Sequence, residues 1–60
     1  MRFPPGVYVS DMGLPAVRVV AWVNGRYRYR PDSWDEGSIL IDADRLESLL
    51  HSGNYQPGML

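Results

Sequence analysis

The feature that most constrains this sequence is an Asn-Gly pair that separates two alternating runs. Residues 17–23 are rich in β-branched and aromatic side chains, and residues 26–30 alternate arginine with tyrosine. Asn and Gly both tolerate the positive φ of a type I′ turn, so Asn24-Gly25 between such runs predicts a β-hairpin over residues 17–30. Because 60 residues form at most one domain, we expect a single small domain, residues 1–60, built around this hairpin.

The pairing register of the hairpin follows by counting outward from the turn. Trp22 then faces Tyr27, and Val20 faces Tyr29. Side chains alternate along a strand, so these four residues share one face, which we predict to be the core face. The opposite face then carries a row of three arginines: Arg26, Arg28 and Arg30.

The segments on either side of the hairpin supply short strands and one helix. Residues 7–10 alternate and predict one strand, and the apolar run at residues 38–41 predicts another. Asp42 occupies a helix N-cap position, and apolar residues at helical spacing predict a helix over about residues 43–52. The expected fold is therefore α+β, with a small three- to four-stranded, mostly antiparallel sheet and one C-terminal helix.

The ends of the helix and the core complete this prediction. Gly53 suits the position after the helix, and residues 54–60 contain Pro57 and Gly58, which predicts an exposed or flexible tail. The expected core comprises Val20, Trp22, Tyr27, Tyr29, Ile39, Ile41, Leu46, Leu49 and Leu50. Such a small core supplies a net stability of about 3–5 kcal/mol.

Charge is divided unevenly between the two halves of the sequence. Residues 1–31 carry five arginines and one aspartate, a formal charge of +4. Residues 32–60 carry six acidic residues and one arginine, a formal charge of −5. Such a division indicates either two binding faces or an N-terminal half that folds against its own C-terminal half.

The candidate basic face comprises Arg18, Arg26, Arg28 and Arg30. Arginines at alternate positions of a strand lie about 6.6–6.8 Å apart, near the spacing of phosphates in an extended nucleic-acid strand. Single-stranded nucleic-acid binders combine such charge with aromatic stacking, but alternation here sends the tyrosines to the core. The arginines therefore also fit an acidic protein partner, or a solvated surface.

The candidate acidic face comprises Asp32, Asp35, Glu36, Asp44 and Glu47. These residues lack the twelve-residue loop pattern of an EF-hand, so we predict no metal site. In a functional interpretation, these acidic residues present a negative surface to a basic groove on a partner. In a structural interpretation, they cap the helix and keep the protein soluble. Trp34 and Tyr55 lie outside the predicted regular elements and are candidate aromatic anchors for an interface.

Catalysis is not expected from this sequence. His51 is the only histidine, cysteine is absent, and no glycine-rich phosphate loop opens a helix. A catalytic carboxylate pair needs a cleft, which 60 residues hardly supply. We therefore predict a non-enzymatic protein with no catalytic residues and no cofactor.

Three segments together resemble part of a known DNA-binding family: residues 14–19 (LPAVRV), 25–29 (GRYRY) and 41–50 (IDADRLESLL). Over about 35 residues they are similar to the second half of an excisionase-type winged-helix domain, in which a hairpin wing precedes a short helix. The resemblance implies DNA contacts by the wing. Only residues 1–13 precede it here, and their prolines and glycine forbid the helix-turn-helix of that family. Of the contacts that this family makes, those that carry over are contacts of the Arg26, Arg28 and Arg30 side chains with the DNA backbone.

These observations favour a small binding protein over an enzyme. We expect a phage or mobile-element accessory protein that inhibits a host defence or nucleic-acid-handling complex, as anti-CRISPR proteins do, by occluding a charged surface. A direct nucleic-acid-binding module that uses the arginine-lined hairpin is the alternative. A structural or assembly subunit, including a homodimer, is a second alternative. No apolar run is long enough to span a membrane and no signal peptide is evident, so we expect a cytoplasmic protein, located in the host cytoplasm if a phage encodes it.

Overall fold

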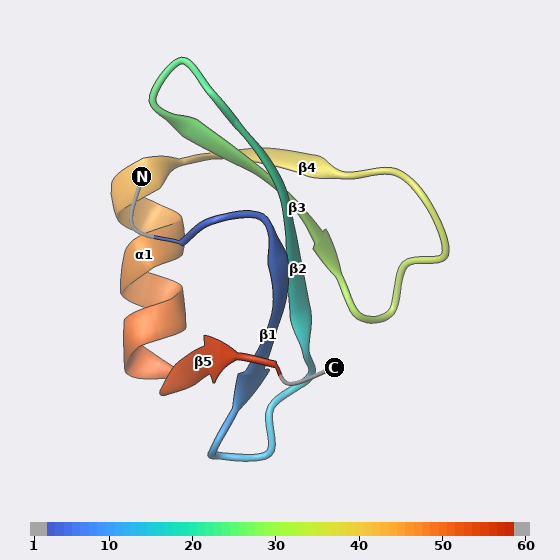
Figure 1. Ribbon diagram of the computed structural model, residues 1–60, viewed down its shortest axis with the longest axis vertical. Coiled ribbons are helices and arrows are strands. Elements are labelled where there is room, and N and C mark those ends of the chain that lie inside the picture. Colours follow the sequence, from blue (N-terminus) through green and yellow to red (C-terminus); the bar gives the residue numbers. More distant parts are fainter. Residues whose placement is uncertain (1–2, 59–60) are drawn as a thin grey trace.

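Strands dominate the first two thirds of the chain, and one helix follows them (Figure 1). The computed structural model describes residues 3–58. Its elements are β1 (Gly6–Ser10), β2 (Val17–Val23), β3 (Arg26–Pro31), β4 (Ile39–Asp42), α1 (Ala43–Ser52) and β5 (Tyr55–Pro57). Within this described part, all strand pairs are antiparallel and the sheet order is β4-β3-β2-β1-β5. The predicted α+β class is confirmed, with more strands than expected.

The β2–β3 hairpin forms around the predicted turn. Asn24 has φ 49° and Gly25 has φ 78°, so both central residues take the left-handed conformation that a type I′ turn requires. Next to the turn the register is the counted one, because Trp22 pairs with Tyr27. The two rings meet edge to face with centroids 4.9 Å apart. The sequence thus predicts this half of the hairpin correctly.

A β-bulge between Val19 and Ala21 changes the register in the other half of the hairpin. Val20 is the extra residue, so Val19 rather than Val20 pairs with Tyr29. A bulge of one residue exchanges the two faces of the strand beyond it. The prediction that Val20 lies in the core is therefore wrong: Val19 is buried in its place, and Val20 is exposed.

The predicted tail differs from the structure, because residues 55–57 form the edge strand β5. Tyr55 pairs with Ser10, and the chain before β5 is held by a hydrogen bond of 2.6 Å from the Ser10 hydroxyl to the carbonyl oxygen of Gly53. Pro57 is tolerated because an edge strand needs no second row of N–H donors. The last two residues of the predicted tail, Met59 and Leu60, lie outside the described residues.

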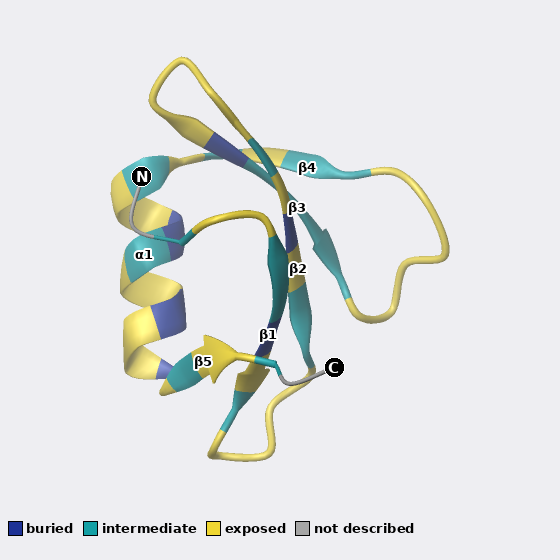
Figure 2. Cartoon of the chain, viewed as in Figure 1, coloured by how far each residue is buried: buried dark blue, intermediate teal, exposed yellow. Residues whose placement is uncertain are grey.

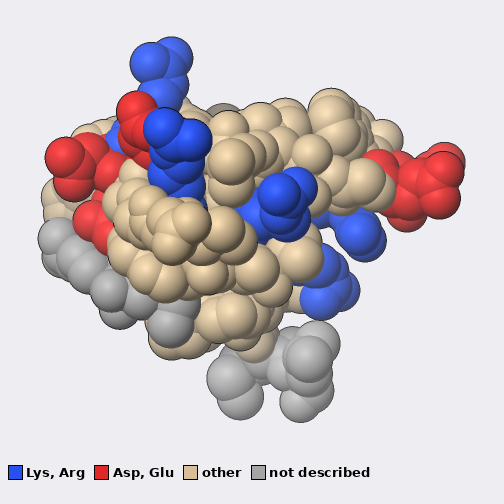
Figure 3. Space-filling view, turned by 90° about the horizontal axis from the view of Figure 1, so that it is seen from above, with Lys and Arg blue, Asp and Glu red and all other residues tan. Residues whose placement is uncertain are grey.

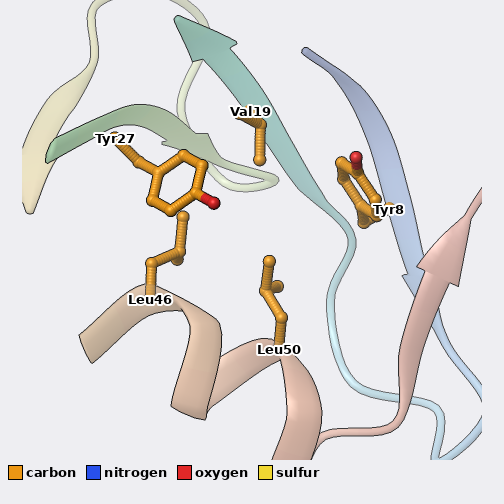
Figure 4. Packing of buried hydrophobic residues seen from close by; sticks show 5 residues of the cluster. All are labelled: Tyr8, Val19, Tyr27, Leu46 and Leu50. Carbon is orange, nitrogen blue, oxygen red and sulfur yellow. The ribbon is translucent and has the colours of Figure 1, made fainter. Parts of the chain in front are cut away.

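The core lies between α1 and the concave side of the sheet (Figure 2). The buried side chains point toward one another from strands and helix alike (Figure 4). They are Tyr8, Val19, Tyr27, Leu46 and Leu50. Three of these were predicted, and Tyr29, Ile39 and Ile41 are half-buried around them.

Two further core predictions are wrong. Trp22 is 38% exposed because it lies near the hairpin turn, beyond the reach of α1, although its ring contacts Tyr27. Leu49 is 52% exposed because it lies at the flank of the helix stripe that Leu46 and Leu50 form, at the rim of the core. The sheet therefore buries a narrower stripe of α1 than its leucine spacing predicts.

The two buried tyrosines keep their hydroxyl groups hydrogen-bonded. Tyr8 donates to the carbonyl oxygen of Pro4 at 2.6 Å, and Tyr27 donates to the carboxylate of Glu47 at 2.7 Å. Tyr27 also accepts a hydrogen bond from the backbone N–H of Phe3 at 3.2 Å. Burial, and next the nearby Tyr27 hydroxyl, raise the pKa of Tyr8 above its usual value of 10.0. Within the described residues, no buried side-chain nitrogen or oxygen lacks a partner.

The ends of α1 depart in detail from the predicted caps. Asp42 precedes the helix as predicted, but its side chain makes no capping hydrogen bond. Gly53 follows the helix with φ −85°, and the left-handed residue is Asn54. Gly53 is needed for space instead, because a Cβ there would lie 2.6 Å from the ring of Tyr55. Among the described residues, no helix is long and apolar enough to span a membrane.

The structure also corrects the winged-helix resemblance. Residues 3–16 contain β1 and a loop, where a winged-helix domain would have its helix-turn-helix. The following hairpin belongs to the middle of the sheet, since β3 pairs with both β2 and β4. It is therefore not a projecting wing at the sheet edge.

Candidate interaction surface

The side of the sheet turned away from α1, here called the outer face, carries the arginines. Cross-strand partners point to the same side, so the residues that pair with Arg28 and Arg18 share this face with them. Leu40 of β4 pairs with Arg28, and Val7 of β1 pairs with Arg18. The tyrosines of β3 point the other way, into the core. The predicted separation of rings and guanidinium groups is therefore observed on β3.

Most of the positive charge on the outer face is not neutralised by carboxylates. Arg28 donates from Nη1 to the hydroxyl of Ser38 at 3.1 Å, and Arg30 donates from Nε to the carbonyl oxygen of Gly37 at 2.7 Å. The side chain of Arg18 has no hydrogen bond or ion pair within residues 3–58. All three arginines therefore keep a full charge that a partner can use.

Arg26 is the exception among the predicted basic residues. Its Nε lies 3.3 Å from the carboxylate of Asp42, with both side chains well exposed. A surface ion pair of this kind contributes little to stability, and its two charges cancel at a distance. Arg26 thus adds less to the outer face than the other three arginines.

The bulge at Val20 brings Arg18 directly opposite Arg30. Counting without the bulge would place Arg18 on the side of Val20 and Trp22, facing the core. Like charges on cross-strand neighbours are unfavourable in the absence of a counter-ion. The fold therefore places two arginines opposite each other on the two central strands, an arrangement that costs some stability.

Apolar side chains lie among these arginines. Leu40 is 42% exposed, and Val9 and Val23 are comparably exposed on the same side of the sheet. The sequence-based prediction missed these residues, although the alternation of Ile39, Leu40 and Ile41 is a signal that the middle residue faces outward. Together the outer face joins charge with apolar area, as the centres of protein interfaces do.

The loop between β3 and β4 adds an aromatic ring beside the arginines. The backbone N–H of Trp34 bonds the carbonyl oxygen of Pro31 at 3.1 Å, which closes a turn, and the indole is 43% exposed. Gly37 has φ 89°, a conformation that favours glycine, and a Cβ built there would lie in ordinary van der Waals contact with the Trp34 ring, at 3.7 Å. Arg18, Arg30 and Trp34 line one open hollow of about 310 Å³.

The predicted acidic residues do not form one face. Asp32, Asp35 and Glu36 lie in the exposed β3–β4 loop, whereas Asp44 and Glu47 lie on α1. In Figure 3 the acidic side chains accordingly gather at two opposite ends, with arginines between them. The carboxylate of Glu47 is also occupied by the hydroxyl of Tyr27. The basic first half and the acidic second half of the sequence therefore do not form one positive end and one negative end of the molecule.

Tyr55 serves the fold of β5. Its hydroxyl donates to the carbonyl oxygen of Pro15 at 2.5 Å, and its ring is half-buried against the core. Of the two aromatic residues predicted as interface anchors, Trp34 is the one that stays exposed on the outer face.

A wider hollow of about 860 Å³ lies between the hairpin turn and α1. Its lining includes Arg26 and Arg45 as well as Asp42 and Asp44. Two positive and two negative side chains give this hollow no net preference for a charged ligand. It is therefore a weaker candidate than the smaller hollow on the outer face.

No protein-family model matches this chain, and no significant match is found among curated proteins or solved structures. Within the described part of the chain, no three His, Cys, Asp or Glu residues are grouped to hold a metal ion. The outer face presents guanidinium, indole and aliphatic groups.

Proposed function

We propose that this chain is a small non-enzymatic binding protein that docks on a protein partner through the outer face of its sheet. The observation that carries the proposal is the group of uncompensated arginines beside exposed apolar side chains, centred on Arg28 and Leu40. Arginine and tryptophan dominate the energetics of protein interfaces, and Trp34 lies next to this group. The acidic loop residues beside the arginines add a second charge sign, which suits a protein surface better than a uniform polyanion.

The biological setting of this binding is part of the proposal. We propose that the chain is an accessory protein of a phage or mobile element, acting in the host cytoplasm. It would inhibit a defence or nucleic-acid-handling complex by covering a charged surface, as anti-CRISPR proteins do. The arginines that β2 and β3 place on one side of the sheet support this interpretation.

Direct nucleic-acid binding is the second candidate. The position of Arg18 opposite Arg30 favours it, because the bulge adds a further cation to the row on β3. Three observations weigh on the other side: few arginines are available, the tyrosines of β3 face the core, and acidic residues flank the row.

Site-specific photocross-linking tests the protein-binding proposal. A photoreactive amino acid replaces Leu40 on the outer face or, as the control, Leu49 on the exposed flank of α1, in cells that naturally make the chain. We expect one defined protein adduct from position 40 that mass spectrometry identifies, that Arg28→Glu abolishes, and that position 49 does not give. Equal adducts from both positions, or none from position 40, would overturn the proposal.

Two solution measurements separate the alternatives. Direct binding to plain DNA or RNA would give an affinity that falls with salt at a log–log slope of about −2 to −3 for three phosphates. The absence of binding at low salt would remove that candidate. A discrete oligomer that persists through a dilution series in light scattering would favour the assembly-subunit alternative instead.

A further inference from the structure

We infer that the hollow between Arg18, Arg30 and Trp34 is an anchor site for a carboxylate side chain, Asp or Glu, presented by an extended segment of the protein partner. This inference rests on the proposed function and names the chemistry of its central contact. The hollow has a volume of about 310 Å³ and is lined by both guanidinium groups. Such a volume accommodates one side chain with part of its neighbour.

The two arginines offer free donors to this hollow. Arg30 uses its Nε for the carbonyl oxygen of Gly37, and no other hydrogen bond of its side chain occurs within residues 3–58. Its two terminal nitrogens therefore remain available, and Arg18 has its whole guanidinium group available. Guanidinium groups bind carboxylates in a two-pronged geometry with short, charge-assisted hydrogen bonds. A carboxylate between them would also relieve the repulsion of the cross-strand pair.

The indole side of the hollow is fixed before any ligand arrives. The Trp34 ring lies beside Gly37, within van der Waals reach of a Cβ built there, and the carbonyl oxygen of Gly37 accepts the hydrogen bond from Arg30. The turn closed by the Trp34 N–H holds the start of the same loop. Because these contacts order the ring and the guanidinium group together, a ligand would meet a preorganised site and lose less entropy on binding.

The remaining lining favours a single carboxylate with an aliphatic neighbour. Val7 lines the hollow and provides apolar contact for that neighbour. Asp32 lines it too and forms no ion pair within the described residues. A chain of phosphates crossing the hollow would bring several negative charges past Asp32 and the other acids of the loop, whereas one carboxylate between the arginines brings a single charge.

A titration followed by nuclear magnetic resonance tests this inference. The probe is the capped tripeptide acetyl-Leu-Glu-Leu-amide, and its matched control is acetyl-Leu-Gln-Leu-amide. We expect saturable shifts at the Trp34 indole N–H and the Arg30 Nε–H with the Glu peptide. Loss of a charged hydrogen-bond acceptor should weaken binding of the Gln peptide about tenfold.

Matched variants show whether the two arginines are responsible. Arg30→Gln and Arg18→Gln should each weaken the Glu peptide about tenfold. Arg45→Gln removes the same charge from α1 and should leave the affinity unchanged, while the amide spectra of all three variants report whether the fold is retained. Equal affinity for the Glu and Gln peptides, shifts centred elsewhere, or no saturable shift would overturn the inference.

A nucleic-acid arm and a cellular arm complete the test. Oligothymidylate that binds the same residues more tightly than the Glu peptide would overturn the assignment to a protein carboxylate. A cross-link from position 40 that survives in the Arg18→Gln/Arg30→Gln double variant would leave the proposed function standing and remove the carboxylate site. Peptide binding without any cross-link from position 40 would retain the site and remove the proposed function.

Discussion

The two faces of the sheet use similar residues for opposite purposes. The inner face buries Tyr27 and gives its hydroxyl a carboxylate acceptor, Glu47, so that ring and polar group are both satisfied within the chain. The outer face leaves Leu40 and Trp34 exposed, and its arginines bond neutral groups or nothing among the described residues. The chain thus places its buried contacts on one face and leaves the other face exposed, where we propose that it binds its partner.

This comparison predicts that substitutions will divide by face. Changes inside should unfold the chain with binding lost as a consequence, whereas changes outside should alter binding in a folded chain. The net stability of about 3–5 kcal/mol makes the division easy to observe, because one core substitution can remove most of it.

The largest effect is expected at Leu50, which is 1% exposed beneath the sheet. Leu50→Ala should destabilise by about 2–5 kcal/mol, through lost burial and the cavity that remains. Urea unfolding followed by circular dichroism measures it. Leu49→Ala, one residue away and half exposed, is the control and should change stability by about 0.5 kcal/mol or less. Equal losses from both would break the comparison of faces.

The next effect is expected at the buried hydroxyl of Tyr27. Tyr27→Phe leaves the Phe3 N–H and the Glu47 carboxylate without this partner and should destabilise by about 1–3 kcal/mol. Tyr29→Phe on the same strand is the control, because its hydroxyl makes no hydrogen bond within the described residues. Thermal unfolding of both variants measures the difference, and similar midpoints would show that the hydroxyl contributes nothing.

A smaller loss of folding stability should appear at alkaline pH. The pKa of Tyr8 is raised in the folded chain, mainly by burial, so the unfolded chain loses this proton first as the pH rises. The contribution of the neutral Tyr8 hydroxyl to the free energy of unfolding is therefore complete below about pH 10. It is lost as the pH rises through the higher pKa that Tyr8 has in the folded chain. Urea midpoints between pH 8 and 11 measure it. Tyr8→Phe should flatten that profile, and an unchanged slope would show that Tyr8 is not responsible.

The smallest change in stability is expected from a substitution on the outer face. Arg18→Gln removes one member of the like-charge pair with Arg30 and should raise stability by a few tenths of a kcal/mol at low salt. The gain should fade at high salt because screening already weakens the repulsion. Arg26→Gln is the contrasting control, since it removes an ion pair with Asp42 and should lower stability slightly. A loss on Arg18→Gln would show that this arginine stabilises the fold.

Much of the fold follows from local signals in the sequence. Asn24 and Gly25 determine the turn and the first pairs of the hairpin, and the spacing of Leu46 and Leu50 determines the inward side of α1. These features depend on residues close in sequence, which is why reasoning from propensity and periodicity finds them.

The remainder depends on contacts that no local pattern specifies. The bulge at Val20 has one indirect signal, because uninterrupted counting would turn Arg18 toward the core. The strand at residues 55–57 has none of the usual signals, since three residues that include a proline resemble a tail. Its pairing with β1 joins the two ends of the chain, and such long-range pairing depends on the whole fold.

The candidate site shows the same division. The arginines of β3 are predictable from alternation, but the hollow they share with Trp34 is not. It requires Arg18 to be moved onto the outer face and the β3–β4 loop to fold back over Gly37. Neither event leaves a pattern that can be read from spacing alone.

The extra residue at position 20 sets which side chains of β2 face inward before the bulge and which face inward after it. Deleting it by a single codon would reverse the inward and outward assignment for every residue of the strand before it, sending a guanidinium group inward and a buried valine outward. A one-residue deletion in the β3–β4 loop would reverse no such assignment in a strand. Variants of this chain should therefore tolerate length changes in that loop far more readily than at the bulge.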